Sequence, residues 1–144
     1  MFTILITGAS GGLAQEMVKL LPDDQLILLG RDKEKLAQLY GNHPQAELVE
    51  MDITDAQALE DLVAELYQRY GKIDVLINNA GYGIFEDFDK ISNKDIHQMF
   101  EVNTFALMNL SRLVASRMKE IRKGHIINIV SMAGLIATGK SSLY

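Results

Sequence analysis

A short apolar run, a glycine-rich turn and an amphipathic segment follow one another at the start of the chain. The apolar run covers residues 2–6, the turn Thr7–Ala14 has glycines at positions 8, 11 and 12, and the amphipathic segment covers 15–21. Glycines let a backbone turn sharply and let a ligand approach it, and the free N–H groups of a helix's first turn attract an anion. We therefore predict a strand, a phosphate-binding turn and a helix; the alternative is an ordinary tight turn that holds no ligand.

The composition excludes several classes of protein. A formal net charge of −5 gives no long-range attraction to nucleic acid or to an anionic membrane surface. The chain has no cysteine, and the spacing of its histidines, His43, His97 and His125, is not typical of a metal site. No apolar run approaches membrane-spanning length, and the first strand begins at residue 2, which leaves no room for a signal peptide. We expect a soluble, cytoplasmic protein without a metal that binds neither nucleic acid nor membrane.

Strand and helix patterns alternate along the chain. After the first pair, we expect strands at 25–29, 46–51, 73–77 and 125–130, and helices at 33–40, 56–70 and 92–122. The strand at 46–51 is less apolar than the others, which favours an edge position. This alternation is typical of an α/β doubly wound parallel sheet with helices on both faces, and right-handed crossovers give the strand order 3-2-1-4-5. We predict one domain over residues 1–144 that stops after the fifth strand.

The longest expected helix, 92–122, has apolar residues on more than one face. Ser92 or Asn93 is expected to cap its start, and Gly124 to stop it. A helix that is apolar on two sides has two surfaces to pack, and the fifth strand has a free edge in this chain. Exposed strand edges and large apolar patches drive association. We therefore expect a homo-oligomer formed through the 92–122 helix, the fifth-strand edge, or both.

Two turns of the chain match the motifs of one family. The pattern Thr-Gly-x-x-x-Gly-x-Gly matches at Thr7, Gly8 and Gly12, with Ala14 in place of the last glycine, a change of one methyl group that we expect to be tolerated. Residues 78–81 read Asn-Asn-Ala-Gly. From residue 3 to residue 144 the sequence resembles the short-chain dehydrogenase/reductase family, which has a Rossmann-type fold. The resemblance implies that the 78–81 turn supports the fourth strand and borders the ribose of the cofactor.

The same resemblance implies catalytic and cofactor-binding positions. Asn103, Ser131 and Tyr144 stand at the family's catalytic asparagine, serine and tyrosine, and Asp52 stands where the family has a carboxylate beside the adenine amino group. The residues expected to bind the cofactor are Gly8, Ser10, Gly11, Gly12, Leu13, Arg31, Asp52, Ile53, Asn79, Ala80 and Gly81.

The implied reaction is hydride transfer between a nicotinamide cofactor and a small carbonyl or alcohol substrate. Hydride that arrives at a carbonyl carbon leaves an alkoxide, which needs a proton donor and a hydrogen-bond donor at the same oxygen; a tyrosine and a serine fill these roles. Free tyrosine has a pKa of about 10, so a cation is needed to favour the phenolate. The family has a lysine one helical turn after the tyrosine, whereas this sequence ends at Tyr144. We therefore expect the cofactor-binding front of a longer dehydrogenase, with little or no activity of its own.

The choice between NADP and NAD depends on the end of the second strand. A carboxylate there would bond both ribose hydroxyls and repel a 2′-phosphate. Gly30 occupies that position and Arg31 follows it, and a guanidinium suits a phosphate. The residues favour NADP over NAD. Asp32 is the opposing observation, which we interpret as a helix cap.

Two functions remain open on the sequence alone. The first is an NADP-dependent oxidoreductase, and the second is a module that binds NADP without catalysis. The presence of Asn103, Ser131 and Tyr144 together favours the enzyme. The loop from Tyr82 to Asp89 either borders a substrate or packs its aromatic side chains beneath itself.

Overall fold

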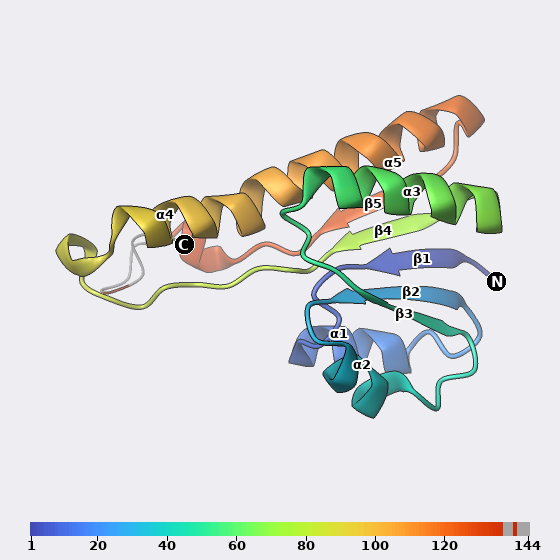
Figure 1. The fold of residues 1–144 in the computed structure, drawn as a ribbon, viewed down its shortest axis with the longest axis horizontal. Helices are drawn as coiled ribbons and strands as arrows, with labels where there is room; N and C mark the ends of the chain where they lie inside the picture. Colours follow the sequence, from blue (N-terminus) through green and yellow to red (C-terminus); the bar gives the residue numbers. More distant parts are fainter. Residues whose placement is uncertain (137–139, 141–144) are drawn as a thin grey trace.

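Five strands form one parallel sheet in the order β3-β2-β1-β4-β5 in a computed structural model that describes residues 1–136 and 140 (Figure 1). The strands are β1 Thr3–Ile6, β2 Gln25–Gly30, β3 Ala46–Glu50, β4 Val75–Asn78 and β5 His125–Asn128. The predicted doubly wound fold and its strand order are confirmed, and β3 lies at the edge as expected.

Helices cover both faces of the sheet (Figure 1). Helices α1 (Gly12–Lys19) and α2 (Lys33–Tyr40) lie on one face, and α3 (Ala56–Tyr70) and α5 (Leu107–Ile121) lie on the other. Alternate strand residues point to opposite faces, so each strand supplies two cores. Ile4 and Leu28 belong to the core beneath α1 and α2, whereas Leu5 and Leu29 belong to the core beneath α3 and α5.

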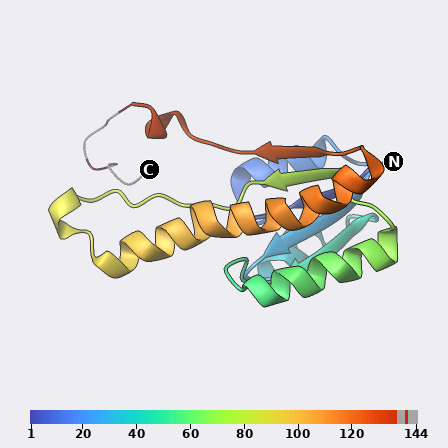
Figure 2. The ribbon, with the colours of Figure 1, turned by 90° about the horizontal axis from the view of Figure 1, so that it is seen from above.

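The long helix is not regular along its whole length. Helix α4 (Asn93–Phe100) continues through a π-helical segment, Glu101–Ala106, into α5, and the three run on as one rod (Figure 2). Ser92 caps the start, where its hydroxyl accepts a hydrogen bond from the Asp95 N–H at 3.1 Å. The sequence places the stop at Gly124, but the helix ends at Ile121 because Arg122 adopts the left-handed conformation, with φ of 53°.

Strand and loop limits differ slightly from the predicted ones. Strand β4 begins at Val75 instead of residue 73, because the Asp74 carboxylate accepts the hydrogen bond of the Thr3 N–H at 2.9 Å, in place of a backbone carbonyl of the strand. Strand β5 ends at Asn128, two residues before its predicted end. The expected loops contain short 3₁₀ helices at Phe88–Lys90 and Met132–Gly134.

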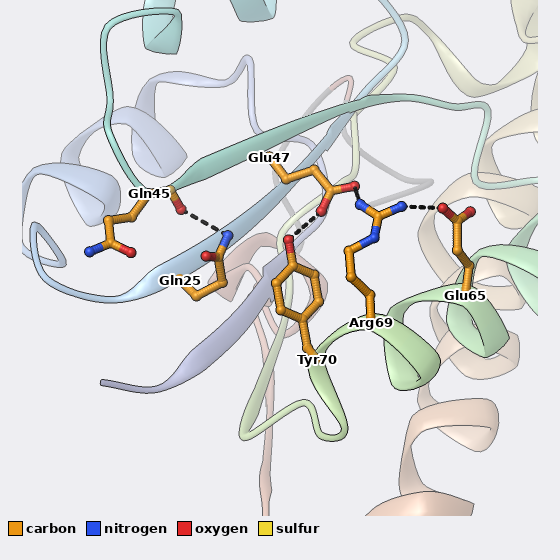
Figure 3. Close-up of polar contacts among 6 residues, drawn as sticks. All are labelled: Gln25, Gln45, Glu47, Glu65, Arg69 and Tyr70. Carbon is orange, nitrogen blue, oxygen red and sulfur yellow. Dashed lines mark hydrogen bonds and ion pairs between the residues drawn. The ribbon is translucent and has the colours of Figure 1, made fainter.

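A polar cluster ties the end of α3 to the edge strand β3 (Figure 3). Arg69 forms ion pairs with Glu47 of β3 and with Glu65 one turn earlier in α3. The Tyr70 hydroxyl donates to the second oxygen of Glu47 at 2.5 Å. Because one carboxylate receives two donors from the last turn of α3, the cluster fixes the position of this helix end against the sheet.

Apolar side chains remain exposed on the long helix and on β5. Phe105 is 53% exposed and Met108 is 60% exposed, whereas Leu110 and Val114 on the inner side are buried. On β5, Ile126 packs against the core beneath α5, and Ile127 on the opposite side is 44% exposed. Within residues 1–136 and 140, none of the helices combines the length and the apolar character needed to cross a membrane.

Candidate functional site

The glycine turn after β1 needs its first glycine for two reasons. Gly8 has a φ of +64°, a conformation that L side chains rarely adopt. A Cβ at this position would lie 2.7 Å from the Ala80 Cα, so a side chain would collide with the turn that follows β4. Gly12 is different, because a Cβ there would meet nothing within 4 Å in the part of the chain that the structure describes. Gly8 therefore serves the fold, and Gly12 leaves open space at the helix start.

The turns after β1 and β4 are bound to each other. The buried Thr7 hydroxyl accepts hydrogen bonds from the N–H groups of Asn79 and Ala80, both at 3.0 Å. In return, the Asn79 side-chain amide donates to the carbonyls of Thr7 and Gly8, both at 3.1 Å. Asn78 extends the network, because its amide donates to Ser111 of α5 and to Asn128 of β5. These bonds fix the two turns on either side of the switch point between β1 and β4.

No side chain among residues 1–136 and 140 caps the N-terminus of α1. Its N-cap residue is Gly11, and its first turn contains no acidic residue. A helix start carries unpaired N–H groups and partial positive charge, which an anion satisfies. The α2 start differs, because the Asp32 carboxylate accepts the Lys35 N–H at 2.9 Å. This bond confirms that Asp32 caps α2, as predicted. Of the two helix N-termini, the one of α1 is therefore the uncapped one.

A cavity of about 500 Å³ lies where the carboxyl ends of β1 to β4 meet. Its volume is within the range of small-molecule and cofactor sites. All eleven residues that the sequence predicts for cofactor binding line this cavity: Gly8, Ser10, Gly11, Gly12, Leu13, Arg31, Asp52, Ile53, Asn79, Ala80 and Gly81. The structure thus brings together residues from four separate segments, and it places the open start of α1 among them.

Seven residues beyond the predicted eleven line the cavity: Leu29, Gly30, Asp32, Lys35, Met51, Tyr82 and Val102. Gly30 and Asp32 entered the sequence-based choice of cofactor, and Tyr82 belongs to the loop for which a substrate border was one alternative, whereas Leu29, Lys35, Met51 and Val102 were missed. The most informative of these is Lys35, a second cation that lines the same cavity as Arg31. The available signal was that Lys35 falls in the first turn of the helix expected at 33–40, close to Arg31 in the sequence. Gly30 has a packing reason, because a Cβ there would lie 3.1 Å from the Leu36 side chain.

Asp52 carries its negative charge readily in this structure. Hydrogen bonds from the Thr54 N–H at 3.0 Å and the Thr54 hydroxyl at 2.8 Å lower the pKa of Asp52, and the Arg31 charge adds a smaller effect in the same direction. The lining of the cavity therefore includes a carboxylate after β3, the cation Arg31 after β2 and the cation Lys35 in the first turn of α2.

The structure places two of the three predicted catalytic residues. Asn103 lies in the π-helical segment, where its side-chain amide donates to the Tyr82 carbonyl at 2.7 Å and accepts from the Tyr82 N–H at 3.0 Å. Ser131 follows β5, and its hydroxyl accepts the Ala133 N–H at 3.1 Å. Tyr144 lies outside the described residues.

The loop after β4 takes part in the site at one end. Tyr82 lines the cavity and is held there by Asn103. Phe85 and Phe88 are 70% and 61% exposed, so these two aromatic side chains do not pack beneath the loop.

Doubly wound nucleotide-binding domains have a parallel sheet in this order, and they bind the nucleotide at the switch point, beside the uncapped start of a helix. Fold and site thus define a Rossmann-type domain. A sequence model of the short chain dehydrogenase family matches residues 2–144, and the chain belongs to this family.

Two relatives show the extent of the similarity. An uncharacterized oxidoreductase of Staphylococcus saprophyticus is 34% identical over 146 residues, which cover 98% of this chain and 59% of the relative. The ketoacyl reductase HetN of a Nostoc species is 34% identical over 148 residues, which cover 99% of this chain and 52% of the relative. The chain thus spans little more than half the length of these relatives.

Solved structures agree with the fold. A short-chain dehydrogenase of Streptomyces avermitilis superposes with a TM-score of 0.93 at 30% identity, over 99% of this chain and 54% of the other. A metagenomic short-chain oxidoreductase in complex with NADP has a TM-score of 0.90 at 29% identity, over 99% and 68% of the two chains. An NAD⁺-bound xylitol dehydrogenase has a TM-score of 0.89 at 27% identity, over 99% and 58%. Similar structures therefore hold either nucleotide.

Proposed function

We propose that this chain forms the cofactor site of an NADP-dependent oxidoreductase that transfers hydride between NADP(H) and a carbonyl or alcohol substrate. The observation that carries the proposal is the single cavity lined by all eleven predicted cofactor-binding residues. The uncapped start of α1 and the open space at Gly12 suit a pyrophosphate, since bare backbone N–H groups face an anion there. When bound, the nicotinamide cofactor supplies or accepts the hydride.

The preference for NADP rests on the two cations between the end of β2 and the first turn of α2. Arg31 and Lys35 line the cavity together, and Gly30 provides no carboxylate that would repel a 2′-phosphate. Asp32 is engaged in capping α2. The similar structure bound to NADP supports this choice and the one bound to NAD⁺ opposes it, so the cation pair is the deciding observation.

The remaining roles belong to the predicted catalytic residues Tyr144, Ser131 and Asn103. Tyr144 would give its hydroxyl proton to the substrate oxygen, and Ser131 would donate a hydrogen bond to the same oxygen. Asn103 would hold the loop after β4 through its two bonds to Tyr82, which fixes the wall of the cavity on the substrate side. We infer the reaction type and the roles of Tyr144 and Ser131 from the family, and the proposed substrate is a small carbonyl or alcohol compound.

We also propose that the protein self-associates through the long helix or the β5 edge. The exposed side chains Phe105, Met108 and Ile127 support this proposal, since apolar surface of this kind is usually covered by a partner.

A kinetic experiment separates the enzyme from a module that only binds NADP. In the whole protein, Tyr144→Phe and Ser131→Ala should each lower NADPH-dependent reduction of a panel of ketones and aldehydes by about a hundredfold or more, while NADPH affinity changes less than about twofold. Tight NADPH binding with no turnover of any carbonyl compound by the unaltered protein would favour the binding module instead.

A further inference from the structure

Tyr40 is the last residue of α2 and lies outside the cofactor cavity, yet it touches the glycine turn. Its side chain is 6% exposed, and its hydroxyl donates to the Ala9 carbonyl at 2.6 Å. Burial raises the pKa of Tyr40, so the hydroxyl keeps its proton and remains a donor at neutral pH. Ala9 itself is fully buried, and its N–H donates to the Leu29 carbonyl at 2.9 Å. The turn is therefore held from β2 and from α2 at the same residue.

The bond from Tyr40 fixes the orientation of one peptide plane. The Ala9 carbonyl and the Ser10 N–H belong to the same peptide, and the peptides of the described chain are trans. In a planar trans peptide the carbonyl and the N–H point in opposite directions. Because the carbonyl points to Tyr40, the Ser10 N–H points away from Tyr40, and Ser10 lines the cavity.

We propose that Tyr40 is a positioning residue for the dinucleotide, whose hydroxyl holds the 9–10 peptide so that the Ser10 N–H is ready to donate to a phosphate of the cofactor. This inference rests on the proposed function, since it concerns the same cavity. Without the hydroxyl, the Ala9 carbonyl would be buried and unpaired, which favours rotation of the peptide toward another donor. The Ser10 N–H would then leave its position at the cavity.

The variant Tyr40→Phe tests this inference, because it removes one oxygen and keeps the ring that packs against the core. A matched control is Tyr67→Phe, which removes another buried hydroxyl from α3 on the opposite face of the sheet, away from the cavity. NADPH binding by the three proteins is measured by titration calorimetry, and thermal unfolding is recorded for each. We expect about a tenfold loss of affinity in Tyr40→Phe, as when one hydrogen bond to a charged group is weakened, and no loss in Tyr67→Phe.

The outcomes separate this inference from the function on which it rests. Equal NADPH affinity in the unaltered protein and Tyr40→Phe overturns the positioning role and leaves the cofactor site intact. Equal losses in both variants also overturn it, because they point to general destabilisation. No binding of NADPH by the unaltered protein overturns the cofactor site and the inference together.

A second measurement covers the case in which Tyr40→Phe does not fold. With 3-fluorotyrosine placed at position 40, the hydroxyl stays and the fluorine reports on its surroundings by NMR. The fluorine resonance should move when NADPH is added and stay in place when adenosine, which has no phosphate, is added. A resonance that NADPH leaves unmoved at saturation would overturn the inference.

Discussion

Replacing Arg31 by alanine should change cofactor choice more than it changes cofactor binding in general. Two unit charges 4 Å apart attract by about 1 kcal/mol in bulk water and by about 4 kcal/mol at an effective dielectric constant of 20. Arg31 is exposed, so its attraction for a 2′-phosphate lies toward the lower value, at about 1.5–2 kcal/mol. This corresponds to about a 10- to 30-fold loss of NADPH affinity. NADH has no 2′-phosphate, and its affinity should change by less than about twofold.

Calorimetry with both nucleotides at two salt concentrations measures this difference. Lys35→Ala should lower NADPH affinity by a smaller factor, about three- to fivefold, because Lys35 is a compact, strongly hydrated charge. Lys33→Ala is the matched control, since Lys33 is an exposed cation of the same helix that does not line the cavity. Salt should weaken NADPH binding more in the unaltered protein than in Arg31→Ala. Equal losses for NADPH and NADH in Arg31→Ala would refute the reasoning.

Three further predictions test the fold and the assembly. Gly8→Ala should destabilise the protein by about 3 kcal/mol, because Gly8 has a positive φ and a Cβ there would collide with Ala80. Gly12→Ala should leave the stability equal or slightly higher, but it should lower the NADPH affinity about tenfold. Urea unfolding measures the stability of both variants, and calorimetry measures their NADPH affinity. Burial alone would raise the pKa of Asp74, but hydrogen bonds from Lys72 and Thr3, together with the charges of Lys72 and Lys123, lower this pKa below its usual value of 3.8. The charged form of Asp74 therefore stabilises the fold above pH 3.8, and this stabilisation is lost as the pH falls through the lowered pKa. Asp74→Asn should therefore cost about 2 kcal/mol at pH 7 and flatten the acid side of the stability profile, and an unchanged profile would contradict the assignment. Met108→Glu should shift the protein toward the monomer, as measured by light scattering. If the unaltered protein is already a monomer at micromolar concentration, the self-association proposal is wrong.

The sequence predicted the architecture well because its signals are local and repeated. Each buried strand is a short apolar run, and Asp32 and Ser92 cap their helices as expected. The strand order followed from crossover handedness and from the turn after β1. The long helix was predicted to end at 122 and ends at Ile121, but the residue that stops it is Arg122 and not Gly124, since nothing in the local pattern shows that Arg122 would adopt the left-handed conformation.

The site residues that belong to sequence motifs could be predicted, whereas those that reach the site only through tertiary packing could not. Residues of the two turns were found from their glycines and asparagines. Lys35 was missed, and the place of the Tyr82 loop was left open, because both depend on how α2 and the loop after β4 dock against the sheet. Tyr40 carries no sequence signal, since its bond to Ala9 joins residues 31 positions apart. Contacts of that range come from the packed fold.

The most direct test of the central claim is an amide NMR titration of this chain with NADPH. We expect saturable shifts at Ser10, Gly11, Gly12 and Leu13, with further shifts at Arg31 and Asp52, and weaker binding of NADH to the same residues. Shifts confined to another surface, or no shift at the start of α1, would contradict a cofactor site at this end of the sheet.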